Sequence, residues 1–259
     1  MPFDVAGGSY DRFMGRYSRL LAPELIAFAA VEHGMRVLDV GCGPGALTAA
    51  LAAHLGPELV AAVDPSERPL RACAARVPGA EFRLAPAEDL PWPNSSFDAV
   101  LSQLVLNFLP DAAAGVHEMR RVARPGGILG SCTWDYANGM RMLRTFWDAA
   151  LELDPAAPDE ARAFRFCTAG ELRRLWAEAG LEDVVTAPLE IEARYEDFDD
   201  YWDPFTLGVG PAGAYCADLD DDRREALRAG CFRLLGSPDG PFGLAARAWA
   251  VRGRVMPTS

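Results

Sequence analysis

The stretch Arg36–Leu51, RVLDVGCGPGALTAAL, constrains the fold of this 259-residue chain more than any other segment. Val37, Leu38 and Val40 form a short apolar run, which is typical of a buried parallel strand. Three glycines follow at alternate positions, and Ala46–Leu55 is dense in helix formers. Glycine lets the backbone bend sharply and brings N–H groups close to a ligand at the positive end of the next helix. The stretch therefore predicts a ligand-binding turn at the carboxyl edge of an open α/β sheet.

Several interpretations fit this turn. The segment GCGPGA, residues 41–46, matches the loose dinucleotide fingerprint G-x-G-x-x-A, and a glycine turn can also serve backbone geometry alone. Asp39 lies just before the turn, where a carboxylate would repel a pyrophosphate and would suit a ligand with a cationic amino acid end. The stretch resembles motif I of the class I S-adenosylmethionine-dependent methyltransferases, D-x-G-x-G-x-G. That resemblance implies that Asp39, Gly41 and Gly43 hold the methionine part of S-adenosylmethionine.

Composition limits the classes of partner. The net charge of −12 argues against nucleic acid, whose phosphates need a basic surface, and against anionic membranes. The chain has no lysine, which excludes Schiff-base catalysis and a phosphate-loop lysine. Six scattered cysteines without a C-x-x-C pair indicate small core residues and no structural zinc site, so no metal is predicted. The first residues lack an apolar signal core and no stretch approaches a membrane span, which predicts a cytoplasmic protein.

A second buried strand is predicted at residues 59–64, LVAAVD, and it ends in Asp64. An acid roughly twenty residues beyond the glycine turn can accept hydrogen bonds from ribose hydroxyls. A dehydrogenase would place its ribose acid there too, so Asp64 supports a nucleoside ligand without choosing between the classes. Pro65 and Ser66 follow it in the predicted cofactor site, with Ser66 at the cap of a helix over residues 67–76.

A third strand is predicted at residues 81–84, followed by APAEDLPWP. This segment resembles the methyltransferase pattern G-D-A-x-x-L-P-F, in which an acid and the next backbone N–H read the adenine. Pro86 occupies the position of that acid, which is a departure from the family pattern. The resemblance leaves the N–H of Ala87 for the adenine, with Glu88 either replacing the acid or lying in solvent.

Residues 96–102, SFDAVLS, resemble the fourth strand of the same family. Gln103 and Asn107 interrupt the apolar run that follows, which indicates a polar surface near the methyl donor, and Gln103 is assigned to the cofactor site. A helix carrying HEMRRV is expected to end at the turn residues RPGG, 124–127, before a fifth strand over residues 128–134.

An amphipathic helix is predicted over residues 9–30, with aromatic residues spaced three or four apart. The pattern is consistent with aromatic packing on the domain. It also resembles an N-terminal helix that covers the cofactor in methyltransferases of this type. That resemblance makes Tyr10, Arg16 and Tyr17 candidates for contact with the methionine end of the cofactor.

The resemblance implies a doubly wound, Rossmann-like α/β fold with seven strands, mostly parallel, one antiparallel strand at the edge, and helical cap insertions. Strands are predicted at residues 184–195 and 245–255, and a helix at 168–179 with the capping-box spacing of Thr168 and Glu171. We expect a single methyltransferase domain over residues 1–259. Its predicted core is about 30–134, 167–195 and 244–256, and its predicted cap elements are about 9–28, 136–166 and 196–243.

The reaction implied by the resemblance is methyl transfer from S-adenosylmethionine to an O, N or C atom of a small organic acceptor, which leaves S-adenosylhomocysteine. A base is needed only where the acceptor loses a proton. Candidate bases are Asp135 and Tyr136, after the fifth strand, and His117, for which a packing or solvent role fits better. Two alternatives are a nicotinamide-dependent oxidoreductase and a catalytically silent module that binds S-adenosylmethionine.

Overall fold

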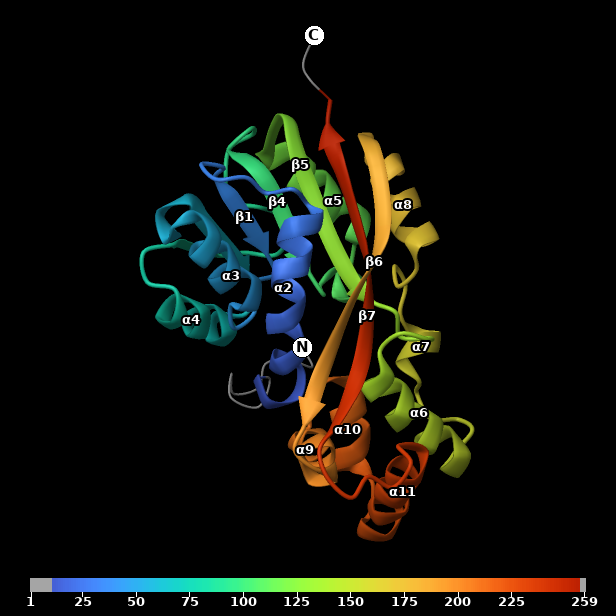
Figure 1. The fold of residues 1–259 in the computed structure, drawn as a ribbon. Helices are drawn as coiled ribbons and strands as arrows, with labels where there is room; N and C mark the ends of the chain where they lie inside the picture. The colour runs from blue at the N-terminus through green and yellow to red at the C-terminus, as the bar shows by residue number, and fades with distance from the viewer. Residues whose placement is uncertain (1–10, 257–259) are drawn as a thin grey trace. The chain divides into compact units, whose positions relative to one another are not determined.

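The computed structural model describes residues 11–256, which form helices around a seven-stranded sheet (Figure 1). The strands are β1 Val37–Val40, β2 Val60–Asp64, β3 Glu81–Leu84, β4 Phe97–Gln103, β5 Ala123–Trp134, β6 Leu181–Tyr195 and β7 Phe242–Val255. The α-helices are α2 Arg16–Phe28, α3 Ala46–Leu55, α4 Glu67–Arg76, α5 Ala112–Val122, α6 Arg141–Leu153, α7 Glu160–Ala163, α8 Ala169–Glu178, α9 Phe198–Trp202, α10 Gly210–Asp218 and α11 Asp221–Leu234. Shorter turns are the π-helix η1 Asp11–Gly15 and the 3-10 helices η2 Pro57–Leu59, η3 Leu106–Phe108 and η4 Asp203–Leu207.

The strand order is β3-β2-β1-β4-β5-β7-β6. β1 pairs in parallel with both β2 and β4, with Val37 opposite Val60 on one side and Ala99 on the other. β2 and β3 therefore lie on one side of β1, and β4 and β5 lie on the other. The strand order reverses at β1, so the carboxyl ends of β1 and β4 form a topological switch point. The predicted doubly wound, mostly parallel sheet is confirmed.

The last strand, β7, lies between β5 and β6 and not at the edge of the sheet, which corrects the expected place of the antiparallel strand. The backbone N–H of Asp135, just after β5, donates to Arg247 O, and a Cβ on Gly130 would lie 3.9 Å from Val251 O. Residue 135 thus lies near residue 247, whereas residue 130 lies near residue 251. The two strands are therefore antiparallel. Figure 1 shows β7 running opposite to β6 as well.

The chain divides into two compact units. Unit 1 takes in the chain up to Tyr17, Trp134–Phe164 and Glu190–Arg247; unit 2 takes in Ser18–Thr133, Arg165–Leu189 and the chain from Ala248 onward. Unit 2 holds β1 to β4 and the glycine turn, whereas α6, α7 and α9 to α11 belong to unit 1. Residues of β6 and β7 are divided between the two units.

The core of unit 2 is apolar on both sides of the sheet. In Figure 1, α2 crosses in front of the sheet, while α5 and α8 lie behind it. Met119 of α5 and Trp176 of α8 are fully buried and belong to one cluster with the strand residues Leu38 and Val100. Each such large side chain contributes roughly 1.5–3 kcal/mol when it leaves water, so this face of the sheet is held mainly by apolar burial.

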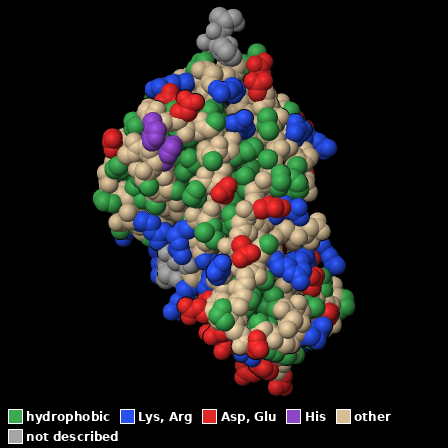
Figure 2. All heavy atoms as spheres, in the orientation of Figure 1, with side chains coloured by type: hydrophobic (Ala, Val, Ile, Leu, Met, Phe, Trp, Pro, Cys, Tyr) green, Lys and Arg blue, Asp and Glu red, His purple; other side chains and the backbone are tan. Residues whose placement is uncertain are grey.

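Unit 1 has an aromatic core. Phe146 of α6 stacks on Phe205 with ring centroids 4.5 Å apart, and Phe13 meets Phe205 edge-on at 5.2 Å. Trp202 and Tyr201 are buried beside them. The outer surface is acidic: Figure 2 shows Asp and Glu side chains gathered at the end of unit 1 that carries α11. The aromatic residues of this region therefore supply a packed core beneath a strongly anionic surface.

Several boundaries differ from those expected. β5 begins at Ala123, and its register with β4 jumps from Phe97↔Ala123 to Ala99↔Ile128, so the turn residues RPGG form an irregularity inside the strand. Gly126 there has a φ of 76°, which explains why a turn signal sits within a strand. The predicted cap of α8 is confirmed, because Thr168 Oγ1 accepts from Glu171 N at 3.2 Å; the Glu171 side chain accepts from Cys167 N, one residue before the N-cap.

The six cysteines are free, and all except Cys167 are buried. Among the helices of residues 11–256, none is both long and apolar enough to cross a membrane.

Candidate functional site

The glycine turn after β1 is held in a left-handed path by its neighbours. Gly41, Gly43 and Gly45 have φ values of 75°, 51° and 93°. The N–H groups of Gly41 and Cys42 donate to Val63 O at 2.8 and 3.0 Å, which ties the turn to β2. Because side chains other than glycine rarely adopt this backbone conformation, the predicted turn depends on these residues.

The three glycines meet different surroundings. A Cβ on Gly41 would lie 2.5 Å from Val105 Cγ2, and one on Gly45 would lie 2.6 Å from Cys73 Sγ. A Cβ on Gly43 would meet no atom within 4 Å among the described residues. Packing therefore requires Gly41 and Gly45, whereas Gly43 faces open space in which a ligand can approach the backbone.

Asp39, on β1, is only 1% exposed. Its Oδ2 accepts a hydrogen bond from Thr48 Oγ1 at 2.6 Å, while its Oδ1 has no hydrogen-bond partner within residues 11–256. Burial raises the pKa of Asp39 to about 7, and hydrogen bonds from Thr48 act against that rise. A buried carboxylate oxygen without a donor is costly, and a cationic amino group would satisfy it. Asp39 thus fits the role that the sequence predicts for it.

Asp64, at the end of β2, links the turn to α4. Its Oδ2 accepts from Gly43 N and its Oδ1 accepts from Ser66 N, both at 2.9 Å. Burial raises the pKa of Asp64, while these two N–H groups lower it. Each carboxylate oxygen can accept a second hydrogen bond, so the side chain still has acceptor capacity for ribose hydroxyls. Ser66 is the N-cap residue of α4, but its side chain makes no capping bond and the carboxylate of Asp64 takes the N–H.

The remaining predicted cofactor residues of unit 2 lie on the loops after β2 and β3 and at the last residue of β4. Pro65 is exposed, and Ala87 is buried. Glu88 Oε1 accepts from Asp111 N at 3.3 Å, so this acid is tied to the start of α5 and not simply surrounded by solvent. Gln103 Nε2 donates to Ser18 O at 3.0 Å, and Gln103 Oε1 is a second buried acceptor without a partner among the described residues.

Arg16 and Tyr17 belong to unit 1, where both have partners. Arg16 Nη1 lies 3.0 Å from Asp200 Oδ2, and its guanidinium sits 4.2 Å from the centroid of the Tyr195 ring. Tyr17 is fully buried, and its hydroxyl lies 2.7 Å from that of Tyr195. Burial raises the pKa of Tyr17. These contacts match the packing interpretation of the helix, while Tyr10 lies outside the described residues.

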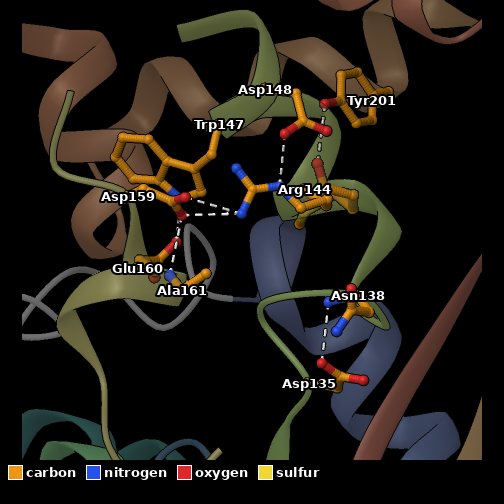
Figure 3. A network of polar contacts seen from close by, with 10 residues as sticks. Asp135, Asn138, Arg144, Trp147, Asp148, Asp159, Glu160, Ala161 and Tyr201 are labelled. Atoms are coloured by element: carbon orange, nitrogen blue, oxygen red, sulfur yellow. Dashed lines mark hydrogen bonds and ion pairs between the residues drawn. The ribbon is translucent and has the colours of Figure 1, made fainter. Parts of the chain in front are cut away.

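The candidate bases also have local partners. Asp135 Oδ1 accepts from Asn138 N at 3.0 Å, as Figure 3 shows, and Asp135 Oδ2 accepts from Arg247 Nε at 3.1 Å. Tyr136 is buried and packs edge-on against Phe164 at 5.1 Å. His117 is exposed on α5, with Nδ1 2.7 Å from Ala113 O. The structure therefore gives Asp135 a turn-forming role and His117 a surface position.

Sequence reasoning missed Thr48 and Cys73. Thr48 Oγ1 donates to Asp39 and accepts from Cys73 Sγ at 3.3 Å. The three residues come from β1, α3 and α4, so only the folded glycine turn brings them together.

Within residues 11–256, no three His, Cys, Asp or Glu side chains are grouped so that they could hold a metal ion.

A second polar network lies in unit 1 (Figure 3). Arg144 of α6 pairs with Asp148 at 2.8 Å and with Asp159 at 3.0 Å. Trp147 Nε1 donates to Glu160 Oε2 at 2.6 Å. Glu160 is buried, and burial raises its pKa to about 7. Both acids lie at the start of α7, where Asp159 Oδ1 accepts from Ala161 N.

We expect Gly41→Ala to lower the free energy of unfolding by about 3 kcal/mol, since it adds left-handed strain and overpacks Val105. Gly43→Ala adds only the strain and should cost about 1 kcal/mol. Urea unfolding of the two variants measures this difference. Equal losses for both variants would contradict the assignment of Gly43 to open space.

Glu160→Gln should stabilise the chain by about 2 kcal/mol at pH 8 and have little effect at pH 5. The folded protein holds the Glu160 proton more tightly than the unfolded chain, so stability falls as pH rises from 4.5 toward 7, and glutamine removes that loss. Urea unfolding at the two pH values checks this, with the exposed Glu225→Gln as the matched control. A gain that does not depend on pH would rule out the titration of Glu160.

Known proteins resemble this chain over part of its sequence. Residues 38–130 match the family described as "Methyltransferase domain". A fatty-acid O-methyltransferase from Mycolicibacterium smegmatis is 38% identical over 116 residues, which cover 44% of this chain and 42% of that protein. The matched part of the chain thus spans about half or less of the length of these curated relatives.

Solved structures share the fold over most of the chain. A candidate type II methyltransferase from Anaeromyxobacter dehalogenans is 25% identical with a TM-score of 0.66, covering 93% of this chain and 97% of that one. A Haemonchus contortus phosphoethanolamine N-methyltransferase, solved with phosphomonomethylethanolamine and S-adenosylhomocysteine, has a TM-score of 0.56 at 15% identity. That match covers 96% of this chain and 59% of the other, and it bears on the fold alone.

Proposed function

We propose that the chain is a class I S-adenosylmethionine-dependent methyltransferase that transfers a methyl group to a small organic acceptor; the match of residues 38–130 to a methyltransferase domain and the similarity to a solved methyltransferase-like structure support this. The observation that carries this proposal is the glycine turn of unit 2. There an open Gly43 lies beside Asp39, whose Oδ1 has no donor among residues 11–256, and beside Asp64. These groups match the charge and hydrogen bonds of an amino acid joined to a nucleoside.

The bound cofactor supplies a methyl group on a sulfonium: the acceptor's electron pair forms the new bond, and the sulfur–carbon pair stays on sulfur as a thioether. We assign Asp39 to the cationic amino group and Asp64 to the ribose hydroxyls. The N–H of Ala87 and the side chain of Glu88 are assigned to the adenine side. Gln103, at the end of β4, is assigned to the region of the methyl donor through its unsatisfied Oε1.

The acceptor is proposed to be a small molecule because the surface is strongly acidic. A net charge of −12 disfavours the phosphates of nucleic acid. The methylated atom, O, N or C, is left open by these residues. With Asp135 already bonded to Asn138 and Arg247, an acceptor that carries its own nucleophilic lone pair fits best.

Isothermal titration of the full chain with S-adenosylmethionine tests the proposal. We expect saturable binding that S-adenosylhomocysteine displaces and a nicotinamide dinucleotide does not. Transfer of labelled methyl groups to the small molecules of a cell extract then tests the reaction. Absence of binding at millimolar cofactor would reject the assignment, and tight binding without transfer would favour the silent module.

Asp64→Ala should weaken S-adenosylmethionine binding by about 1–3 kcal/mol, since the ribose loses a charged hydrogen-bond acceptor. Titration calorimetry measures the change, and urea unfolding verifies that the variant folds. Asp64→Asn keeps a carbonyl acceptor and should lose less. Glu178→Ala removes an exposed acid from α8 of the same unit and serves as the control for net charge. Unchanged affinity in a folded Asp64→Ala variant would refute the ribose role.

A further inference from the structure

The first turn of α3 lacks the side-chain cap that helices usually have. Its N-cap is Gly45, which has no side chain, and its φ is 93°. Gly45 cannot be replaced by a capping residue, because a Cβ there would lie 2.6 Å from Cys73 Sγ. The carboxylate that reaches this turn comes from Asp39 on β1, across the glycine loop. The first turn of α3 is therefore bonded to β1 through the side chain of Thr48.

Thr48 connects that carboxylate to the helix. It is fully buried in α3, and its hydroxyl donates to Asp39 Oδ2 at 2.6 Å. The same hydroxyl oxygen accepts from Cys73 Sγ at 3.3 Å. With the thiol proton directed at Thr48, the hydroxyl proton is directed at Asp39. The direction of this hydrogen-bond chain favours a negatively charged Asp39.

We propose that Thr48 is a positioning residue: its hydroxyl occupies Oδ2 of Asp39, so that Oδ1 remains the acceptor for the cationic amino group of the cofactor. This inference rests on the proposed function. It adds a residue on α3 that touches no ligand itself and acts only through the carboxylate that it holds.

The charges around Asp39 show why such a donor is needed. Burial raises the pKa of Asp39 to about 7, and the neighbouring Asp64 raises it further, while hydrogen bonds from Thr48 lower it. The Cys42 thiol does not supply charge, because its pKa is raised by Cys73, by burial and by both aspartates. Removal of the Thr48 hydroxyl should therefore move the ionisation of Asp39 to higher pH.

The test measures ligand binding to the full chain by calorimetry between pH 6 and pH 9. S-adenosylhomocysteine carries the amino acid end, and 5′-methylthioadenosine lacks it. Thr48→Val keeps the shape of the side chain and removes the hydroxyl. We expect it to weaken S-adenosylhomocysteine about tenfold at pH 7 and to shift the low-pH limb of the affinity profile to higher pH. The high-pH limb, set by the amino group of the ligand, should be common to all variants.

Three controls separate positioning from folding. Binding of 5′-methylthioadenosine should be unchanged in Thr48→Val, and Thr48→Ser should restore the wild-type profile. Thr145→Val removes a buried hydroxyl that has no partner among the described residues and should leave both ligands unaffected. If Thr48→Val does not fold, Thr48→Ala, which also lacks the hydroxyl, is used and should shift the limb in the same direction.

An unshifted pH profile, or equal weakening of both ligands, would overturn the positioning role and leave Thr48 as a structural residue. In either case the wild-type chain still binds S-adenosylhomocysteine, so the proposed function stands. If the wild-type chain binds neither ligand, the proposed function fails, and this inference fails with it.

Discussion

The left-handed turn between Val40 and Ala46 is the constraint on which the arrangement of unit 2 depends. Two of its glycines lie against side chains, Val105 and Cys73, at distances that leave no room for a Cβ. The third, Gly43, is free of such contacts and donates its N–H to Asp64. Gly41 and Gly45 are thus fixed by packing, while the backbone of Gly43 stays open to a ligand. The same turn is bonded to the end of β2 through Val63 O.

Three buried acids, Asp39, Asp64 and Glu160, each accept at least one hydrogen bond, which offsets part of the cost of burying a carboxyl group. Asp64 receives two backbone N–H groups, and Asp39 receives the hydroxyl of Thr48. In unit 1, Glu160 receives the indole N–H of Trp147. Asp39 differs from Asp64 because one of its oxygens keeps no donor among the described residues. A buried carboxylate oxygen without a donor costs stability, and a cationic ligand group at this position would offset that cost.

In unit 1, the aromatic and charged side chains described here have their partners within the unit. Its aromatic side chains pack on one another, and its polar side chains pair among themselves, as Arg16 does with Asp200 and Arg144 with Asp159. The pairing of Arg16 and Tyr17 within this unit illustrates how a helix that resembles a cofactor-covering element can equally be explained by local packing. Side chains of this unit are therefore less direct indicators of chemistry than the glycine turn.

The sequence by itself determined the order of strands and helices from residue 37 to residue 134, because strand, glycine turn and helix follow from local propensities and short spacings. It also singled out Asp39 and Asp64 as candidate site residues, from their places near the carboxyl ends of β1 and β2. Only the tertiary structure decided that β7 enters the sheet between β5 and β6, and that the acid of β1 meets Thr48 and Cys73. Those arrangements join residues far apart in the chain, and no local pattern encodes which buried hydroxyl or strand edge a folded backbone will bring within hydrogen-bond distance.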